Sequence, residues 1–355
     1  MVAFGLLIGG LVLLVFGAEW LVRGASQLAG RAGISPLAIG LTVVAYGTST
    51  PELAVSINAA LTGQADIGMG NVVGSNICNV LLILGVSALA APLIVSSQLV
   101  RIDVPLMIAV SLGVVGLAFD GKVSRVDGLI LLAVAIGYTA LQLVLAKREA
   151  SIDADATPPS GSVVASVLFI LVGLGLLMLG ARWMVGSAVT IAKWWGVSEL
   201  VIGLTVVAVG TSLPELMTSV VASLRGQRDI AVGNIVGSNL FNLTAVLGAA
   251  SAISPNGVAV AAETLRFDLP VMAAVAVICL PIFFTGSTVA RWEGALLLAY
   301  YVAYVTYLVM AAQRHEATQG FGDAMRFFVV PITAAVFVGL TVLELRRRRN
   351  GAANV

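Results

Sequence analysis

The sequence predicts an all-α polytopic membrane protein, made of two inverted five-helix repeats and an additional eleventh transmembrane helix near the C-terminus. Three observations predict this fold. Hydrophobic residues make up 59% of the 355 residues and charged residues only 10%, whereas a soluble domain carries about 25% charged residues. Apolar stretches long enough to cross a bilayer follow one another along the chain. The first half of the chain also resembles the second half.

A helix needs about 20 mostly apolar residues to cross a bilayer core. The spans predicted on this criterion are 3–22, 35–61, 67–91, 102–119, 126–146, 163–184, 198–224, 230–253, 267–285, 292–312 and 327–345. No basic residue precedes the first span, so we interpret it as a retained helix and not as a cleaved signal peptide. The expected division of the chain is a first repeat at 1–146, a cytoplasmic linker at 147–162, a second repeat at 163–313, an extra transmembrane helix at 327–345 and a basic tail at 346–355.

The distribution of Lys and Arg predicts how these helices are oriented, because basic residues concentrate in cytoplasmic loops. They are more frequent on the side that holds Arg23, Arg31, Arg101, Lys147, Arg148, Arg225, Arg228, Arg291 and Arg346 to Arg349. This side is expected to face the cytoplasm, with the N-terminus outside and the C-terminus inside. The plasma membrane is the expected location.

The internal repeat is strongest between residues 47–85 and 210–248. With a constant offset of 163, 22 of the 39 aligned residues are identical. The similarity extends over about five helices on either side of the linker. An odd number of helices makes the second copy enter the membrane from the opposite side, which is the inverted-repeat arrangement of many secondary transporters. Such proteins tend to bind their substrate between the repeats, near the bilayer midplane.

Each repeat carries two helices with polar groups that lipid would reject. These groups are Thr48, Ser49, Glu52, Asn71, Ser75, Asn76 and Asn79 in the first copy, and Thr211, Ser212, Glu215, Asn234, Ser238, Asn239 and Asn242 in the second. Pro51 and Pro214 interrupt the helical hydrogen bonding. They free the carbonyls of Gly47 and Gly210 and loosen their neighbours, among which are Ala45 and Ala208.

Helical spacing brings these groups together, because residues four apart share a face. The glycines of the motifs are expected to let the polar faces approach closely: Gly70, Gly74, Gly233 and Gly237. The result would be a cage of carboxylate, hydroxyl, amide and carbonyl oxygens. Such a cage suits hard cations such as Ca²⁺ or Na⁺. Burying a charged side chain at mid-bilayer costs roughly 2.5–3.5 kcal/mol, so Glu52 and Glu215 are the strongest indication of a cation site.

Several other classes of protein are disfavoured. The net charge of +1 does not predict a nucleic-acid partner. With one His and two Cys, the sequence does not favour a zinc site, a haem site or a disulfide scaffold. No protease or hydrolase motif is present, so no enzymatic activity and no cofactor are expected. The sequence leaves the oligomeric state open, and a monomer is compatible with it.

The motifs GTSTPEL and GTSLPEL, together with GNVVGSN and GNIVGSN, resemble the two alpha repeats of the cation/calcium exchanger superfamily, in its sodium/calcium exchanger branch. The resemblance covers the first ten predicted helices. It implies antiport of Ca²⁺ against Na⁺, ions held by helices two, three, seven and eight, and helices one and six that slide across this core. Some relatives have an aspartate where this chain has Asn242, and its absence argues against potassium dependence.

Carried over by position, the resemblance implies a role for each residue of the cage. Glu52 and Glu215 would be the carboxylates shared by Ca²⁺ and Na⁺, and Thr48 and Thr211 would contribute Ca²⁺ ligands. The flanking Na⁺ sites would be completed by the carbonyls of Ala45 and Ala208 and by Ser49, Ser75, Ser212 and Ser238. Asn79 and Asn242 would border the central site.

The charge of the two glutamates makes the site −2. One Ca²⁺ would neutralise it and three Na⁺ would leave +1, which predicts electrogenic exchange. Ca²⁺/H⁺ antiport remains an alternative, because glutamates can also carry protons. A cation channel lined by the same oxygens is a further alternative, although duplicated helices broken by proline favour alternating access.

Overall fold

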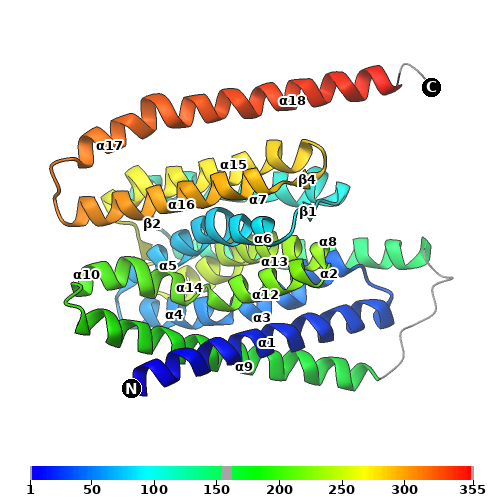
Figure 1. The fold of residues 1–355 in the computed structure, drawn as a ribbon, viewed down its shortest axis with the longest axis horizontal. Helices are drawn as coiled ribbons and strands as arrows, with labels where there is room; N and C mark the ends of the chain where they lie inside the picture. The colour runs from blue at the N-terminus through cyan, green and yellow to red at the C-terminus, as the bar shows by residue number, and fades with distance from the viewer. Residues whose placement is uncertain (1, 153–161, 353–355) are drawn as a thin grey trace.

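The computed structural model describes residues 2–152 and 162–352, and these residues form long helices packed side by side (Figure 1). The first half contains α1 (Val2–Ala32), α2 (Pro36–Ile39), η1 (Gly40–Val44), α3 (Ala45–Thr48), α4 (Thr50–Leu61), α5 (Ala65–Cys78), η2 (Asn79–Leu84), α6 (Gly85–Ala90), η3 (Leu99–Asp103), α7 (Val104–Leu117), η4 (Ala118–Asp120) and α8 (Arg125–Ile152). The turns η1, η2 and η3 are π-helical and η4 is a 3₁₀ turn.

The second half repeats this order. It contains α9 (Val163–Trp194), α10 (Glu199–Ile202), η5 (Gly203–Val207), α11 (Ala208–Gly210), α12 (Leu213–Leu224), α13 (Arg228–Phe241), η6 (Asn242–Val246), α14 (Leu247–Ile253), η7 (Thr264–Asp268), α15 (Leu269–Phe284) and α16 (Arg291–Ala312). The π-helical turns η5, η6 and η7 fall at the positions that correspond to η1, η2 and η3. Local irregularities of the backbone are therefore duplicated along with the sequence.

The helices account for the predicted spans with one difference. Within the described residues, nine helices are long and apolar enough to cross a membrane, and a tenth span is formed by 203–210 and 213–224, which meet at a bend of 59°. The second predicted span is divided at Ser49, and its apolar part, Pro36–Thr48, is shorter. The fifth predicted span, 126–146, agrees with the apolar stretch Arg125–Ala146, and α8 continues beyond it to Ile152, into the predicted linker; residues 153–161 lie outside the described part of the chain.

Two short antiparallel strand pairs join the halves. They are formed by β1 (Leu93–Ile94) with β4 (Thr288–Val289), and by β2 (Lys122–Val123) with β3 (Val258–Ala259). In the repeat alignment β1 corresponds to β3, and β2 corresponds to β4. Each pair thus joins a strand of one repeat to the non-equivalent strand of the other, which is the reciprocal pattern of two copies related by a twofold axis.

Helices α1 and α9 pack directly against each other, as Figure 1 shows. A Cβ atom on Gly10 would lie 2.8 Å from the carbonyl oxygen of Gly180, and one on Gly17 would lie 2.8 Å from that of Gly173. Because the partner number falls as the residue number rises, the two helices are antiparallel. These equivalent first helices therefore run in opposite directions, as inverted repeats require.

The remaining glycines of the motifs reveal a difference between the halves. Gly233 and Gly237 of α13 touch the backbone of the segment 37–41, at 3.0 and 2.6 Å from the positions that their Cβ atoms would take. Their equivalents on α5, Gly70 and Gly74, have nothing within 4 Å. The predicted close approach is thus wrong for α5, because no atom of the segment 203–207, equivalent to 40–44, lies within 4 Å of these positions, although α11 contacts α5 nearby.

The C-terminal segment consists of α17 (Thr318–Ala324), the π-helical turn η8 (Met325–Val329) and α18 (Val330–Ala352). In Figure 1 it forms the edge opposite α1 and α9. It packs on α15 and α16, where Tyr300 Oη lies 2.6 Å from Thr333 Oγ1 and Trp292 stacks on Phe337. Residues 318–347 are apolar and long enough to cross a membrane.

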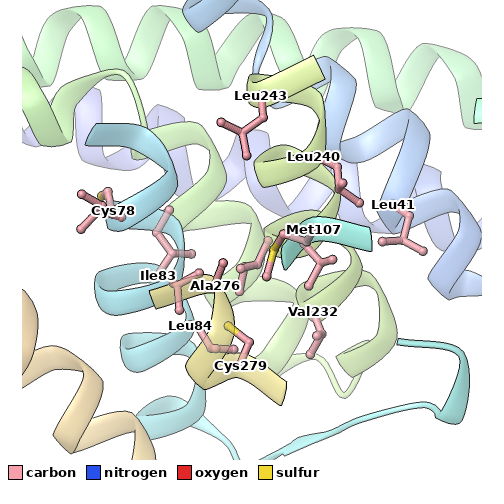
Figure 2. Packing of buried hydrophobic residues seen from close by; sticks show 14 of the residues in the cluster. Leu41, Cys78, Ile83, Leu84, Met107, Val232, Leu240, Leu243, Ala276 and Cys279 are labelled. Carbon is pink, nitrogen blue, oxygen red and sulfur yellow. The ribbon is translucent and has the colours of Figure 1, made fainter. Parts of the chain in front are cut away.

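The core between these helices is apolar. Cys78 and Cys279 are free and buried within it (Figure 2), where they pack as small apolar residues.

The contact between α1 and α9 generates a stability prediction. In Gly173→Ala the new methyl group would lie 2.6 Å from the backbone nitrogen of Leu21, so we expect the substitution to lower the free energy of unfolding by about 1–3 kcal/mol, as for other overpacked contacts. Gly175→Ala is the matched control on the same helix, because nothing lies within 4 Å of its Cβ position. Thermal unfolding of the purified variants measures both. Equal midpoints for the two variants would contradict this contact.

Candidate ion-binding site

The predicted site residues lie on broken helices at the centre of the structure. Each half of the chain contributes two of these helices. Buried in the interior are Ala45, Thr48, Ser49, Glu52, Ser75, Asn79, Ser212, Glu215, Ser238 and Asn242. The other two differ, since Thr211 is half-buried and Ala208 is exposed. The structure therefore buries all first-half members of the predicted set, and in the second half only Ala208 and Thr211 are more accessible.

The break between α3 and α4 lies at Ser49, two residues before the proline that cannot donate a backbone hydrogen bond. The carbonyl oxygen of Ala45 accepts from Ser49 N–H at 3.0 Å and from Thr48 Oγ1 at 3.3 Å. Two protein donors thus occupy the carbonyl that the sequence predicted to be loosened.

The break between α11 and α12 is arranged differently. Ser212 N–H donates to the carbonyl oxygen of Val209 at 3.1 Å and not to that of Ala208, which lies four residues back. The chain also bends by 59° here. The two equivalent breaks therefore differ in this hydrogen bond, although their dihedral angles are nearly the same, with φ −86° and ψ 10° at Ser49 and φ −89° and ψ 7° at Ser212.

The two glutamates are 1% exposed and each interacts with hydroxyl groups of the other repeat. Ser49 Oγ donates to Glu215 Oε1 at 2.9 Å. The hydroxyl of Ser212, from the second repeat, and that of Ser75 interact with the Glu52 carboxylate, which also senses the charge of Glu215. The carboxylates that the sequence placed on separate helices are thus brought into one electrostatic environment.

Two asparagines hold the backbone that carries these glutamates. Asn71 Nδ2 donates to the carbonyl oxygen of Glu52 at 3.2 Å and to the serine hydroxyl four residues further on at 3.0 Å. Asn234 Nδ2 makes the same two contacts with Glu215, at 3.4 Å, and with the equivalent serine, at 2.9 Å. Asn234 Oδ1 also accepts from Thr48 Oγ1 at 3.1 Å. Both asparagines therefore hold the backbone of the glutamates in place.

Several oxygens of the site receive no hydrogen bond from the protein, among the buried atoms of the described residues. They are Glu52 Oε2, Glu215 Oε2, Asn79 Oδ1, Asn242 Oδ1 and Ser238 Oγ. Buried polar atoms are normally paired, so such a set calls for an explanation. Carboxylate, amide and hydroxyl oxygens are the ligands that hard cations prefer, and a cation at this place would satisfy them.

Sequence reasoning did not assign every residue that shapes the site. Asn71 and Asn234 were recognised as polar residues but not as supports of the glutamate backbone. Met107 and Met272, whose sulfur atoms accept from Asn239 and Asn76, gave no polar signal. Their equivalence at an offset of 165, which the repeat alignment contains, is the signal that could have identified them.

The fold and this site define a class of membrane protein with a buried cation site between two repeats. A family model described as sodium/calcium exchanger protein matches residues 2–144 and 165–310. The chain is 37% identical to the sodium/calcium exchanger MaX1 of Methanosarcina acetivorans, over 86% of this chain and 98% of the relative. It is 38% identical to the inner membrane protein YrbG of Escherichia coli K12, over 72% and 81%.

Solved structures agree with the sequence relatives. The sodium-calcium exchanger NCX_Mj, soaked with Na⁺ and Ca²⁺, superposes with a TM-score of 0.75 at 31% identity, covering 86% of this chain and 98% of that one. The chain therefore belongs to the sodium/calcium exchanger family.

The supporting asparagines generate a prediction about stability. Asn234 has three hydrogen-bond partners and Asn71 has two. We therefore expect Asn234→Ala to lower the free energy of unfolding more than Asn71→Ala, by about 0.5–1.5 kcal/mol, the net value of one hydrogen bond. Chemical or thermal unfolding of the two purified variants provides the comparison, and a larger loss for Asn71→Ala would contradict the contacts described.

Proposed function

We propose that this protein exchanges Ca²⁺ for Na⁺ across the plasma membrane by alternating access. The residues that would hold the ions are those carried over from the motifs. They are Glu52, Glu215, Thr48, Thr211, Ser49, Ser212, Ser75, Ser238, Asn79 and Asn242, with the carbonyls of Ala45 and Ala208. The ions are substrates, and the proposal needs no cofactor.

One observation carries this proposal: the five buried site oxygens without a hydrogen-bond donor. Two belong to carboxylates, so the site would hold charge −2 when both are ionised, and neutralising this charge in the interior requires cations or protons. A Ca²⁺ ion accepts six to eight oxygen ligands, a number that these oxygens and nearby carbonyls and water can supply. Three Na⁺ would leave a net charge of +1, so the exchange would move charge across the membrane.

The choice of Na⁺ over H⁺ as counter-ion is supported by the relatives. MaX1 is named a sodium/calcium exchanger, and NCX_Mj is a sodium-calcium exchanger studied with Na⁺ and Ca²⁺. Hydroxyls of Ser49, Ser75 and Ser212 around the glutamates add neutral oxygen ligands of the kind that Na⁺ uses.

The asymmetry of the two halves supports access from one side. With the orientation predicted from Lys and Arg, the segment 37–41 that packs on α13 lies in the cytoplasmic half, and the more exposed segment 203–211 lies in the outer half. At the cytoplasmic end, an ion pair of 2.5 Å between Arg225 and Glu19 joins the end of α12 to α1. The site would thus be reached from outside in this conformation.

The exchange is tested by radioactive Ca²⁺ uptake into Na⁺-loaded proteoliposomes that are diluted into Na⁺-free medium at equal pH. We expect uptake by the wild type and loss of at least about 90% of it in Glu52→Gln, because a group essential for ion binding at mid-membrane is removed. Glu316→Gln, on the exposed connection before α17, is the matched control and should retain full activity.

The alternatives give different results in the same vesicles. Uptake that needs an outward proton gradient and ignores Na⁺ would show Ca²⁺/H⁺ antiport instead. Uptake without any counter-ion would indicate a channel. A membrane potential that is positive inside should speed uptake if three Na⁺ leave for each Ca²⁺ that enters, since net positive charge then leaves the vesicle with each cycle, and should be without effect if the exchange is neutral.

The proposed access predicts unequal reactivity of two equivalent positions. Ala208 is exposed and Ala45 is 0% exposed. In whole cells, a membrane-impermeant thiol reagent should therefore modify Ala208→Cys at least about tenfold faster than Ala45→Cys, because burial prevents reagent access. Both variants keep the backbone carbonyl that is the proposed ligand. Faster modification of Ala45→Cys would show that the open side had been assigned wrongly.

A further inference from the structure

Asn76 and Asn239 lie three residues before the site-bordering asparagines and are 3% exposed. Each one pairs with an asparagine of the opposite repeat. Asn242 Nδ2 donates to Asn76 Oδ1 at 3.3 Å, and Asn79 Nδ2 donates to Asn239 Oδ1 at 3.1 Å. The four amides thus form two crossed pairs beside the glutamates, related by the repeat.

The orientation of the Asn76 amide follows from its other contact. Its Nδ2 lies 3.4 Å from the backbone carbonyl oxygen of Asn239. A carbonyl can only accept a hydrogen bond, so the NH₂ group must face it and Oδ1 must face the opposite way. Asn242 then has to offer its NH₂ group to Asn76. The remaining oxygen, Asn242 Oδ1, is turned away and has no protein donor.

The second pair is oriented by a sulfur atom. Asn239 Nδ2 lies 3.5 Å from the Sδ of Met107, a residue of the buried apolar cluster drawn in Figure 2. A thioether sulfur is a weak acceptor and cannot donate, so Asn239 presents its oxygen to Asn79. Asn79 Oδ1 is then left without a protein donor, as Asn242 Oδ1 is. Met272 stands in the same relation to Asn76, at 3.8 Å.

We infer that Asn76 and Asn239 are positioning residues that set the cation specificity of the site, because each holds the amide of the opposite repeat with its oxygen toward the ions. The inference rests on the proposed function, in which Asn79 and Asn242 border the ion site. An amide can present either an oxygen or an NH₂ group. A reversed amide would direct partial positive charge at a cation and would oppose its binding. The crossed pairs remove this ambiguity.

The crossed arrangement distinguishes this role from helix packing. Asn76 acts on Asn242 and Asn239 acts on Asn79, whereas residues on the same helix, such as Asn76 and Asn79, do not orient each other. Mutations of two residues that act through one contact are non-additive, and mutations of independent residues add. The pattern of additivity therefore reports which asparagine orients which.

The experiment is a set of four double-mutant cycles, with the half-saturating Ca²⁺ concentration for Na⁺-driven uptake as readout. Asn76→Ala and Asn242→Ala should each raise it about tenfold, the lower range for a hydrogen bond to a charged group, while the maximal rate changes less. The double variant should be no worse than either single variant. The same holds for Asn239→Ala with Asn79→Ala.

The matched controls are the same-helix pairs, Asn76→Ala with Asn79→Ala and Asn239→Ala with Asn242→Ala. Their effects should multiply to about a hundredfold, as for independent residues. Multiplication in all four cycles, or non-additivity within the helices, would overturn the inference. So would an unchanged half-saturating concentration in the Asn76→Ala and Asn239→Ala variants.

A second measurement covers two other outcomes. If an alanine variant does not fold, serine replaces alanine at that position, and the cycle is repeated with Ca²⁺-dependent thermal stabilisation of the purified protein. If the wild type shows no Na⁺-driven uptake, the proposed function fails. The crossed pairs are then judged by the thermal measurement alone, where additive Ca²⁺ shifts would overturn them.

Discussion

Two carboxylates buried between helices, those of Glu52 and Glu215, are the constraint on which the rest of the structure depends. Their charge cannot be left uncompensated at membrane depth, where even one ionised side chain is costly. The surrounding residues are arranged accordingly. Serine hydroxyls from the opposite repeat contact the carboxylates, asparagines hold the backbone behind them, and prolines interrupt the helices that carry them. Among the described residues the compensation remains incomplete, because Glu52 Oε2 and Glu215 Oε2 have no hydrogen-bond partner, and under the proposed function a cation would complete it.

Both repeats contribute to stabilising the two carboxylates. The hydrogen bonds between the crossed amides, and the one between Ser49 and Glu215, each join one half of the chain to the other. Reciprocal contacts, such as β1 with β4 and β2 with β3, give the halves similar surroundings. Their conformations nevertheless differ: the segment 37–41 touches Gly233 and Gly237 of α13, whereas nothing lies within 4 Å of the Cβ positions of Gly70 and Gly74 on α5. Two related sequences in two conformations would suit alternating access, since exchanging the two conformations would move the opening to the other side.

The amides beside the glutamates add specificity without adding charge. With asparagine at position 242, the site keeps only the two carboxylate charges, and its selectivity must then come from how neutral oxygens are oriented. Each crossed pair of amides has one partner that can only accept a hydrogen bond. This partner is a backbone carbonyl for Asn76 and a sulfur atom for Asn239. The two acceptors determine how all four amides are oriented. If Asn76 and Asn239 act as inferred, the apolar core takes part in ion selection, because Met107 belongs to it.

Much of this protein could be predicted from its sequence. Long apolar stretches determine membrane-spanning helices, and the repeat with its odd number of helices determines their opposed directions. Proline, glutamate and asparagine at repeated spacing identify the site, because helical periodicity is a local property of the chain. Only the tertiary structure decided that Gly233 and Gly237 are packed while Gly70 and Gly74 are not, that Ala208 is exposed while Ala45 is buried, and that Asn76 pairs with Asn242. These outcomes depend on how rigid helices are placed relative to one another. Two equivalent motifs of nearly the same sequence can take either placement, so no local pattern distinguishes them.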